Sequence, residues 1–192
     1  MIKEEKMKKD LRCITGLFVF AMIMIVMGTY QPVFAGTAAE IDRDVDSALQ
    51  KLYDKTPAAK ELAKVAKGIL VFPDIVKGGL IIGGQYGEGA LRVNGKTVGY
   101  YSSVAASYGL QAGVQSFGYA LFFITDSALA YLKKSEGWEI GTGPSLVIVD
   151  AGAAASLTTT TAKSDIYAFF FDQKGLMAGI GIQGSKITKL DK

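Results

Sequence analysis

The chain has 192 residues and a net charge of +3, with no histidine and a single cysteine, Cys13. These counts exclude a Ser-His-Asp or Cys-His catalytic arrangement outside the first residues of the chain, since both need an imidazole base. They also argue against zinc and copper sites, which draw on histidine and cysteine ligands. We therefore expect that the protein is not an enzyme and that it binds neither a metal ion nor a cofactor.

Residues 1–35 have the pattern of a cleaved secretory signal peptide. An apolar stretch runs from Ile14 to Met27, and Val33-Phe34-Ala35 precedes Gly36 as a cleavage site of the A-x-A type. The alternative is an uncleaved membrane anchor, but 14 residues fall short of the ~20 that span a bilayer. A basic segment comes first, with Lys3, Lys6, Lys8, Lys9 and Arg12. We therefore expect export to the periplasm or the outside of the cell.

Residues 36–192 have the length of one domain with a sizeable core. The first 35 residues carry five basic and three acidic side chains, so the remainder holds 16 basic and 15 acidic residues, a net charge of +1. A net charge this close to zero gives no support for nucleic-acid binding. Without cysteine the domain must be held together by packing alone.

A pair of amphipathic helices is expected over residues 37–67. Thr37 and Glu40 form a capping box, and apolar residues follow at helical spacing to about Tyr53. A second helix should begin at Thr56-Pro57 and stop at Gly68.

The remainder, residues 68–192, reads as β structure with one short helix over 126–134. Asn94-Gly95 predicts a two-residue hairpin turn, and Pro73 is expected to end the first strand. The strands are expected at 69–72, 80–82, 90–93, 97–101, 107–115, 119–124, 138–141, 145–149, 154–161, 165–171, 176–182 and 185–190. The predicted class is α+β, with one antiparallel sheet.

One phrase, Gly-Leu-x-x-Gly, occurs three times, at 79–83, 109–113 and 175–179. Glycine weakens the interior of a strand, so its repeated use indicates a bend, a bulge or the close approach of another backbone. Glycine-kinked strands let a sheet curl. We therefore expect a curved sheet or a barrel.

Lysines recur along the second predicted helix at Lys60, Lys64 and Lys67, with apolar residues on its other faces. A basic stripe beside an apolar stripe is typical of a helix that lies in a lipid headgroup layer. The alternative is a solvated outer face on a helix packed against the sheet.

The stretch from Ala66 to Leu190 resembles the SYLF domain, a lipid-binding family whose eukaryotic members also bundle actin. The residues that carry the resemblance are Gly68-Ile69-Leu70-Val71-Phe72-Pro73, Lys77-Gly78-Gly79, Gly83 to Gly89, Tyr108 to Gly113, Gly143-Pro144 and Lys174 to Gly179. With the leader, the chain looks like a bacterial, exported member. The resemblance implies binding to membrane lipids with anionic, phosphoinositide-like headgroups, and it adds Lys77 to the candidate lipid-binding residues. It does not imply actin binding, because an exported bacterial protein does not meet actin filaments in the cell that made it.

Two rival functions remain open. A structural or adaptor protein of the envelope would bind an unknown protein partner through the β-rich body, and an exposed apolar patch away from the helices would favour it. A carboxylate hydrolase would need two paired carboxylates, whereas the acidic residues are scattered near predicted strand ends and turns. The aromatic residues of the β-rich body can fill the core, lie under the helices, face a partner or surround an acyl chain.

Overall fold

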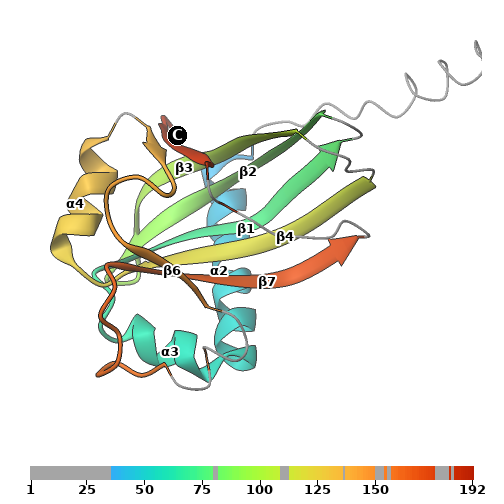
Figure 1. Ribbon diagram of the computed structural model, residues 1–192. Helices are drawn as coiled ribbons and strands as arrows, with labels where there is room; N and C mark the ends of the chain where they lie inside the picture. Colours follow the sequence, from blue (N-terminus) through green and yellow to red (C-terminus); the bar gives the residue numbers. More distant parts are fainter. Residues whose placement is uncertain are drawn as a thin grey trace, which may run out of the picture. The chain divides into compact units, whose positions relative to one another are not determined.

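The computed structural model describes residues 36–79, 82–108, 113–135, 137–149, 154, 157–175, 182 and 184–192 (Figure 1). All of them belong to one compact unit, Gly36–Lys192. Its helices are α2 (Ala38–Lys55), α3 (Pro57–Ala63) and α4 (Asp126–Lys134). Its strands are β1 (Gly68–Gly79), β2 (Ile82–Val93), β3 (Lys96–Tyr108), β4 (Gly113–Phe123), β5 (Trp138–Glu139), β6 (Leu146–Val149), β7 (Ile166–Gly175) and β8 (Lys186–Leu190).

The eight strands form one curved sheet in the order β5-β8-β3-β2-β1-β4-β7-β6. Every neighbouring pair is antiparallel except β6 and β7, which run parallel. The predicted class, α+β with a curved sheet, an N-terminal helical pair and one short inserted helix, is confirmed. The expectation of a wholly antiparallel sheet is wrong at this one pair. Two parallel strands need a long crossover connection, and 16 residues lie between the end of β6 at Val149 and the start of β7 at Ile166.

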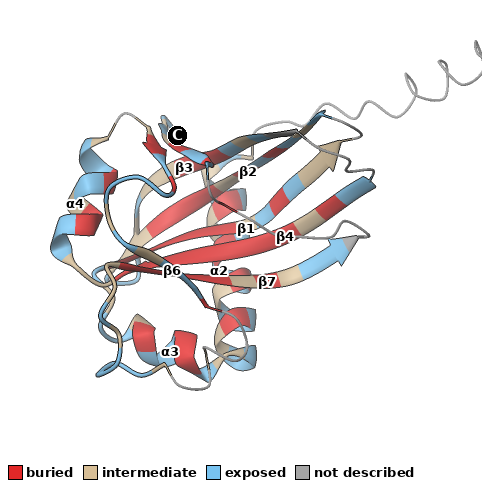
Figure 2. Ribbon diagram, in the orientation of Figure 1, coloured by how far each residue is buried: buried red, intermediate tan, exposed pale blue. Residues whose placement is uncertain are grey.

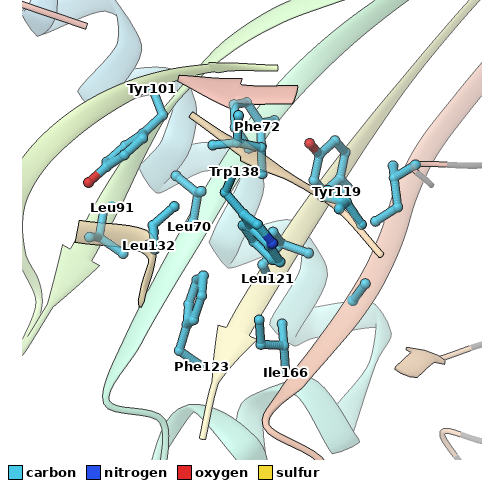
Figure 3. Close-up of a cluster of buried hydrophobic side chains, with 14 of the residues drawn as sticks. Leu70, Phe72, Leu91, Tyr101, Tyr119, Leu121, Phe123, Leu132, Trp138 and Ile166 are labelled. Carbon is cyan, nitrogen blue, oxygen red and sulfur yellow. The ribbon is translucent and has the colours of Figure 1, made fainter. Parts of the chain in front are cut away.

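The two faces of the sheet carry separate hydrophobic cores (Figure 2). One face packs against α2 and α3, and we call it the helix face. The other, the inner face, packs against α4 and the segment around Trp138 (Figure 3). Inner-face side chains include Leu70, Phe72, Leu121 and Phe123, all fully buried. Strand residues therefore alternate between two apolar environments over most of the sheet, which explains the nearly continuous apolar runs of β1 and β4.

Helix α2 begins as predicted. The Glu40 amide donates to the Thr37 hydroxyl at 3.3 Å, and the Thr37 amide donates to the Glu40 carboxylate at 2.8 Å. The helix is fixed to the sheet by Arg92, whose guanidinium donates to the Asp46 carboxylate at 2.6 Å and to the Asp42 carbonyl at 3.1 Å. Its buried stripe is Ile41, Val45, Ala48 and Leu52.

Helix α3 is shorter than expected. It starts at Pro57, as the proline at N1 predicts, but it ends at Ala63, and Lys64 is already its C-cap. Residues Lys64 to Lys67 form a turn that brings the chain to β1, where the Lys67 amide donates to the Phe123 carbonyl at 2.7 Å. The chain leaves the helix early because it must enter the sheet beside β4.

Strand β1 continues through Pro73, which was expected to end it. The register shifts by one residue between the pairs Phe72–Tyr119 and Ile75–Phe117, so β1 contains a bulge at Pro73 and Asp74. A bulge leaves its extra residue outside the ladder, and proline, which has no amide hydrogen, is tolerated there.

Other boundaries also differ from the sequence predictions. The Asn94-Gly95 hairpin is confirmed, with φ values of 50° and 75°. The expected strand at 107–115 instead contains the end of β3 and the start of β4, and the expected strand at 80–82 contains the start of β2. Described residues of the expected strand at 154–161 lie outside any strand, and Thr158 to Thr161 form a turn. The expected strand at 176–182 lies outside the described residues, except for Ile182.

The described parts of the three Gly-Leu-x-x-Gly phrases lie at one end of the sheet. Gly79 is paired with Gly83 on β2 and with Gly113 on β4. Gly175 on β7 is paired with Gln115, two residues further along β4. A side chain on Gly79 would meet the Cα atom of Gly83 at 2.4 Å. The close approach of two backbones is therefore the reason for glycine in the first phrase, and most of the other two phrases lies outside the described residues.

Candidate functional site

Two carboxylates of the β-rich body, those of Asp165 and Asp172, make structural contacts. The Asp165 carboxylate accepts hydrogen bonds from the Ser145 hydroxyl at 2.7 Å, the Ser145 amide at 2.9 Å and the Thr125 hydroxyl at 2.9 Å. These hydrogen bonds lower the pKa of Asp165, and the two from Ser145 have the largest effect. Asp172 forms ion pairs with Lys55 at 2.9 Å and Lys51 at 3.5 Å. Within the described residues, no group of three or more His, Cys, Asp and Glu side chains is placed to hold a metal ion.

The three predicted lysines of the helical pair lie near one another, but only Lys60 is on α3 itself. Lys60 is exposed and makes no ion pair with any described residue. The Lys64 ammonium lies 2.6 Å from the Glu61 carboxylate, and the Lys67 ammonium lies 3.8 Å from that of Asp126. These pairs are exposed and each contributes little to stability, so the ammonium groups stay available to an anionic surface.

The apolar side of α3 is not available in the same way. Ala58, Ala59 and Leu62 are buried in the core of the helix face. Among the described residues beside the lysines, Val65 is the large aliphatic side chain that is exposed, at 38%. The expected basic stripe is therefore exposed, but the apolar stripe that was expected beside it is mostly buried. This surface can attract an anionic bilayer but has little to insert into it.

Lys77 lies apart from the other three candidates. Ten residues of chain separate it from Lys67, a path of about 30 Å along β1. Lys77 is half-buried on the inner face between its register partners Gln85 and Gln115, and it makes no ion pair with a described residue. The Gln115 side-chain oxygen is buried and has no hydrogen-bond partner among the described residues. The structure thus separates the predicted lipid-binding lysines into two groups.

A second surface lies on the helix face, at the end of the sheet that holds the glycine phrases. Five large apolar side chains are exposed there, and we call them the strand-end patch: Val76 at 50%, Ile82 at 72%, Tyr86 at 41%, Val104 at 46% and Val114 at 68%. Towards this end of the strands in Figure 2, pale blue and tan segments appear among the red ones. Small residues, Gly78, Gly84 and Ala106, lie between the large ones on the same face. The patch is therefore continuous over four strands.

The register defines the arrangement of the patch. Directly paired residues of antiparallel strands share a face, so one row crosses six strands of the sheet. The members of this row are Lys186, Val104, Tyr86, Val76, Ser116 and Lys174. Its apolar centre is flanked by an exposed lysine at each end.

Acidic groups border the same patch and balance its charge. Glu139 is the register partner of Lys186. Asp74, at the β1 bulge, lies near Lys174; partial burial raises the pKa of Asp74, although the Ser116 hydroxyl and the Lys174 ammonium act in the opposite direction. The border is therefore close to neutral, and apolar contact is what the patch offers to a partner.

Sequence reasoning did not find the strand-end patch. The signal was present, because each of its residues alternates with a residue of the inner face, but alternation alone does not show where α2 stops covering the sheet. The aromatic residues, by contrast, have gone mainly to the cores: Phe122 and Phe169 lie under the helices, and Phe72, Phe117 and Tyr119 pack on the inner face.

A cavity beside α3 has the size of a small-molecule site. Its volume is about 610 Å³, within the usual range of about 300–1,000 Å³. It lies between α3 and the β6–β7 edge, and the residues lining it include Lys55, Glu61, Val149, Leu157 and Phe170. Apolar walls with a lysine among the lining residues can accommodate an amphiphile.

No helix in the described part of the chain combines the length and apolar character needed to cross a bilayer. A comparison with protein families finds that residues 104–192 match the family model described as "Ysc84: Las17-binding protein actin regulator". No curated protein matches the chain. The matched range contains Val104, Val114 and the two flanking lysines of the strand-end patch, whereas all four predicted lysines lie before it.

Proposed function

Because the match over residues 104–192 places the chain in the SYLF family, whose members bind lipids or actin-regulating partners, we propose that this protein binds membrane lipids without catalysing a reaction on them. We place it in the bacterial envelope, exported by its leader and peripheral on the membrane. Its ligands are anionic lipids, and the reaction-free role agrees with the lack of imidazole and thiol groups after residue 35. Actin has no part in the proposal, because export removes the protein from the cytoplasm.

The observation that supports this function best is the strand-end patch. Full burial of a large aliphatic or aromatic side chain contributes about 1.5–3 kcal/mol. The five side chains are 41–72% exposed, so moving them into the acyl boundary corresponds to roughly 4–8 kcal/mol before the cost of association. The apolar burial available at this sheet end therefore supports a membrane contact.

The helical lysines supply a smaller, electrostatic contribution. A basic residue near an anionic membrane surface contributes about 1 kcal/mol, so Lys60, Lys64 and Lys67 together reach about 3 kcal/mol at most. Glu61 and Asp126 reduce that total because they compensate two of the three charges. Salt screens this term and leaves the apolar term nearly unchanged.

Changing Lys60, Lys64 and Lys67 together to glutamate tests the electrostatic contribution. We expect binding to anionic vesicles at about 50 mM salt to fall roughly 5- to 30-fold, with no change on neutral vesicles. A matched control changes Lys133, Lys134 and Lys163 to glutamate, which alters the net charge equally on other exposed positions. Equal losses in the two triple variants would show that only net charge matters and that the α3 lysines make no specific contact.

Vesicle flotation tests the function itself. The purified protein is expected to float with anionic vesicles at about 50 mM salt, and more weakly with neutral ones. Failure to float with either kind of vesicle would end the proposal. The readout needs no knowledge of the natural lipid, because synthetic anionic and neutral lipids are compared directly.

A second candidate is an envelope adaptor that binds another protein through the strand-end patch. The observation that favours it is the position of the patch on the body of the sheet, beyond the part that α2 and α3 cover. The two candidates differ in one measurement. An adaptor would not bind the vesicles. Aspartate substitutions in its strand-end patch would instead abolish cross-linking to its protein partner in the envelope.

A further inference from the structure

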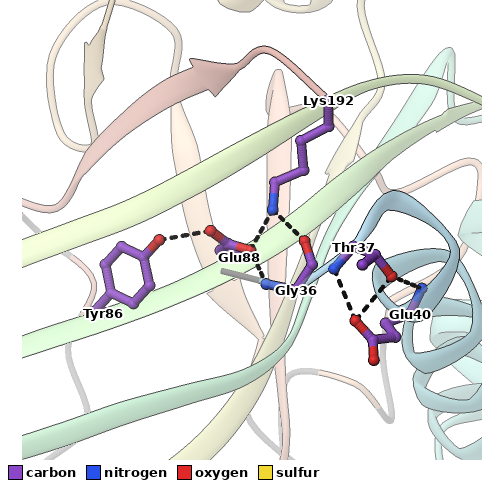
Figure 4. A network of polar contacts seen from close by, with 6 residues as sticks. All are labelled: Gly36, Thr37, Glu40, Tyr86, Glu88 and Lys192. Carbon is purple, nitrogen blue, oxygen red and sulfur yellow. Dashed lines mark hydrogen bonds and ion pairs between the residues drawn. The ribbon is translucent and has the colours of Figure 1, made fainter. Parts of the chain in front are cut away.

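Gly36, the first described residue, is held by a nearly buried ion pair (Figure 4). The Glu88 carboxylate accepts hydrogen bonds from the Gly36 nitrogen at 3.1 Å, the Lys192 ammonium at 2.8 Å and the Tyr86 hydroxyl at 2.7 Å. The Lys192 ammonium also donates to the Gly36 carbonyl oxygen. The Glu88 and Lys192 side chains are only 10% and 12% exposed. A single carboxylate thus joins Gly36, just before α2, to Lys192, just after β8.

The charges of this cluster do not balance while the Ala35–Gly36 peptide bond is intact. Glu88 and Glu40 supply two negative charges, Lys192 supplies one positive charge, and the Gly36 amide is neutral. Burial acts to raise the pKa of Glu88, but the hydrogen bonds from Lys192 and Tyr86 outweigh it, so the pKa is lowered and the carboxylate is ionised. Hydrogen bonds from Thr37 likewise lower the pKa of Glu40. One more cation would neutralise the group.

The sequence already predicts hydrolysis of the Ala35–Gly36 bond; we propose that the α-ammonium group this leaves on Gly36 is received by the Glu88 carboxylate. Water supplies the atoms: its hydroxyl joins the carbonyl carbon of Ala35, and its hydrogen joins the Gly36 nitrogen, which takes a further proton at neutral pH. The nitrogen already lies at hydrogen-bond distance from the receiving oxygen. The inference goes beyond lipid binding and does not depend on it.

Because Gly36 lies at the start of a helix, its ammonium group needs a negatively charged partner. Gly36 precedes the N-cap of α2, where the helix dipole disfavours a positive charge. Glu88 from β2 and Glu40 from α2 offset that effect. Among the described residues, Lys192 is the cation bonded to Glu88, whereas Arg43, which also acts on Glu40, is paired with Asp44 at 3.2 Å. The cluster therefore has the donors, the acceptors and the net charge to hold a free amino terminus in place.

The first test determines where the processed chain begins. The full-length protein, with its leader, is produced in a bacterial host with a general export pathway, and the exported form is sequenced and weighed. A chain that begins at Gly36 is expected. A chain that keeps residues 1–35, or that begins at another residue, overturns the proposal.

A second test measures the ammonium–carboxylate pair in the processed protein. Acetylation of the α-amine restores a neutral amide that still donates to Glu88, so it removes the charge alone. We expect acetylation to lower the Tm by about 2–4 °C in the wild type and by less than about 1 °C in Glu88→Gln. Equal shifts in the two proteins would contradict a pair with Glu88.

A measurement on the unsubstituted protein covers the case in which Glu88→Gln does not fold. Amino-terminal groups ordinarily titrate with a pKa of about 7.7–8.0. Glu88 and Glu40 outweigh Lys192 at this site, and Tyr86, whose pKa is raised to about 12, stays neutral, so we expect the pKa of the Gly36 amine to lie above that range. A value within or below it would overturn the proposal.

Discussion

Replacing both Ile82 and Val114 with aspartate is expected to reduce binding to anionic vesicles by at least about 100-fold. These are the two most exposed side chains of the strand-end patch, at 72% and 68%. Each loses about 1–2 kcal/mol of apolar burial at the membrane, and each new carboxylate is repelled by anionic headgroups. The sum exceeds the ~3 kcal/mol that corresponds to 100-fold in affinity. Vesicle co-sedimentation over a range of lipid concentrations measures the change.

Val98→Asp is the matched control for this double substitution. Val98 is 48% exposed on β3, but it lies beside the Asn94-Gly95 hairpin at the other end of the strand. Like each single substitution in the patch, it introduces one negative charge and one loss of β propensity, but it does so outside the patch. Binding within about threefold of wild type is expected. If the control loses as much affinity as the double variant, the patch is not the membrane contact.

Gly89→Ala is expected to lower the free energy of unfolding by about 3 kcal/mol or more. A Cβ atom at this position would lie 2.0 Å from the Val71 carbonyl oxygen and 2.8 Å from its carbon. Those atoms belong to β1 just before its bulge and cannot rotate away as a side chain can. The central β1–β2 ladder must therefore separate locally. Urea denaturation, analysed by linear extrapolation, gives the change.

Gly84→Ala provides the comparison within the same strand. A Cβ atom there meets nothing closer than the Ala105 carbonyl oxygen at 3.8 Å, which is ordinary contact. The alanine also reduces the backbone freedom of the unfolded chain, so we expect stability within about 1 kcal/mol of wild type. A large loss at Gly84 and a small one at Gly89 would mean that the approach of β1 to β2 differs from the one described.

Local signals in the sequence predicted the elements that depend on a few neighbouring residues. The Thr37–Glu40 capping box, proline at N1 of α3 and the Asn94-Gly95 turn are each specified within about four residues, and all three are present. The helix over 126–134 also has the predicted bounds. The glycine phrases indicated close approach of another backbone, and Gly79 shows it.

Elements that depend on distant partners were placed less well. Pro73 ends a strand by local rules, yet pairing on both sides carries β1 past it through a bulge. Residues 107–115 have β-type composition throughout, so composition could not show that β3 and β4 divide there. The early end of α3 follows from the route of the chain into β1, which is a property of the tertiary structure.

The candidate site shows the same division. Lysine spacing identified Lys60, Lys64 and Lys67 correctly as exposed residues near α3, but it could not show that Glu61 and Asp126 accompany them. Lys77 was grouped with them on a resemblance, whereas it faces the inner side of the sheet. The strand-end patch emerges only when register and burial are known, because its five residues are spread over 39 positions from Val76 to Val114.

A single fluorescent label tests most directly whether this protein meets membranes through the strand-end patch. Cys13 is the only cysteine, so the domain from Gly36 onward can carry one introduced cysteine at Val114, at Val98 or at Lys60, labelled with a polarity-sensitive dye. Addition of anionic vesicles is expected to shift the emission to the blue for the label at Val114, and to leave the label at Val98 unchanged. A shift for the Lys60 label alone would assign the contact to α3, and no shift at Val114 would contradict insertion of the patch.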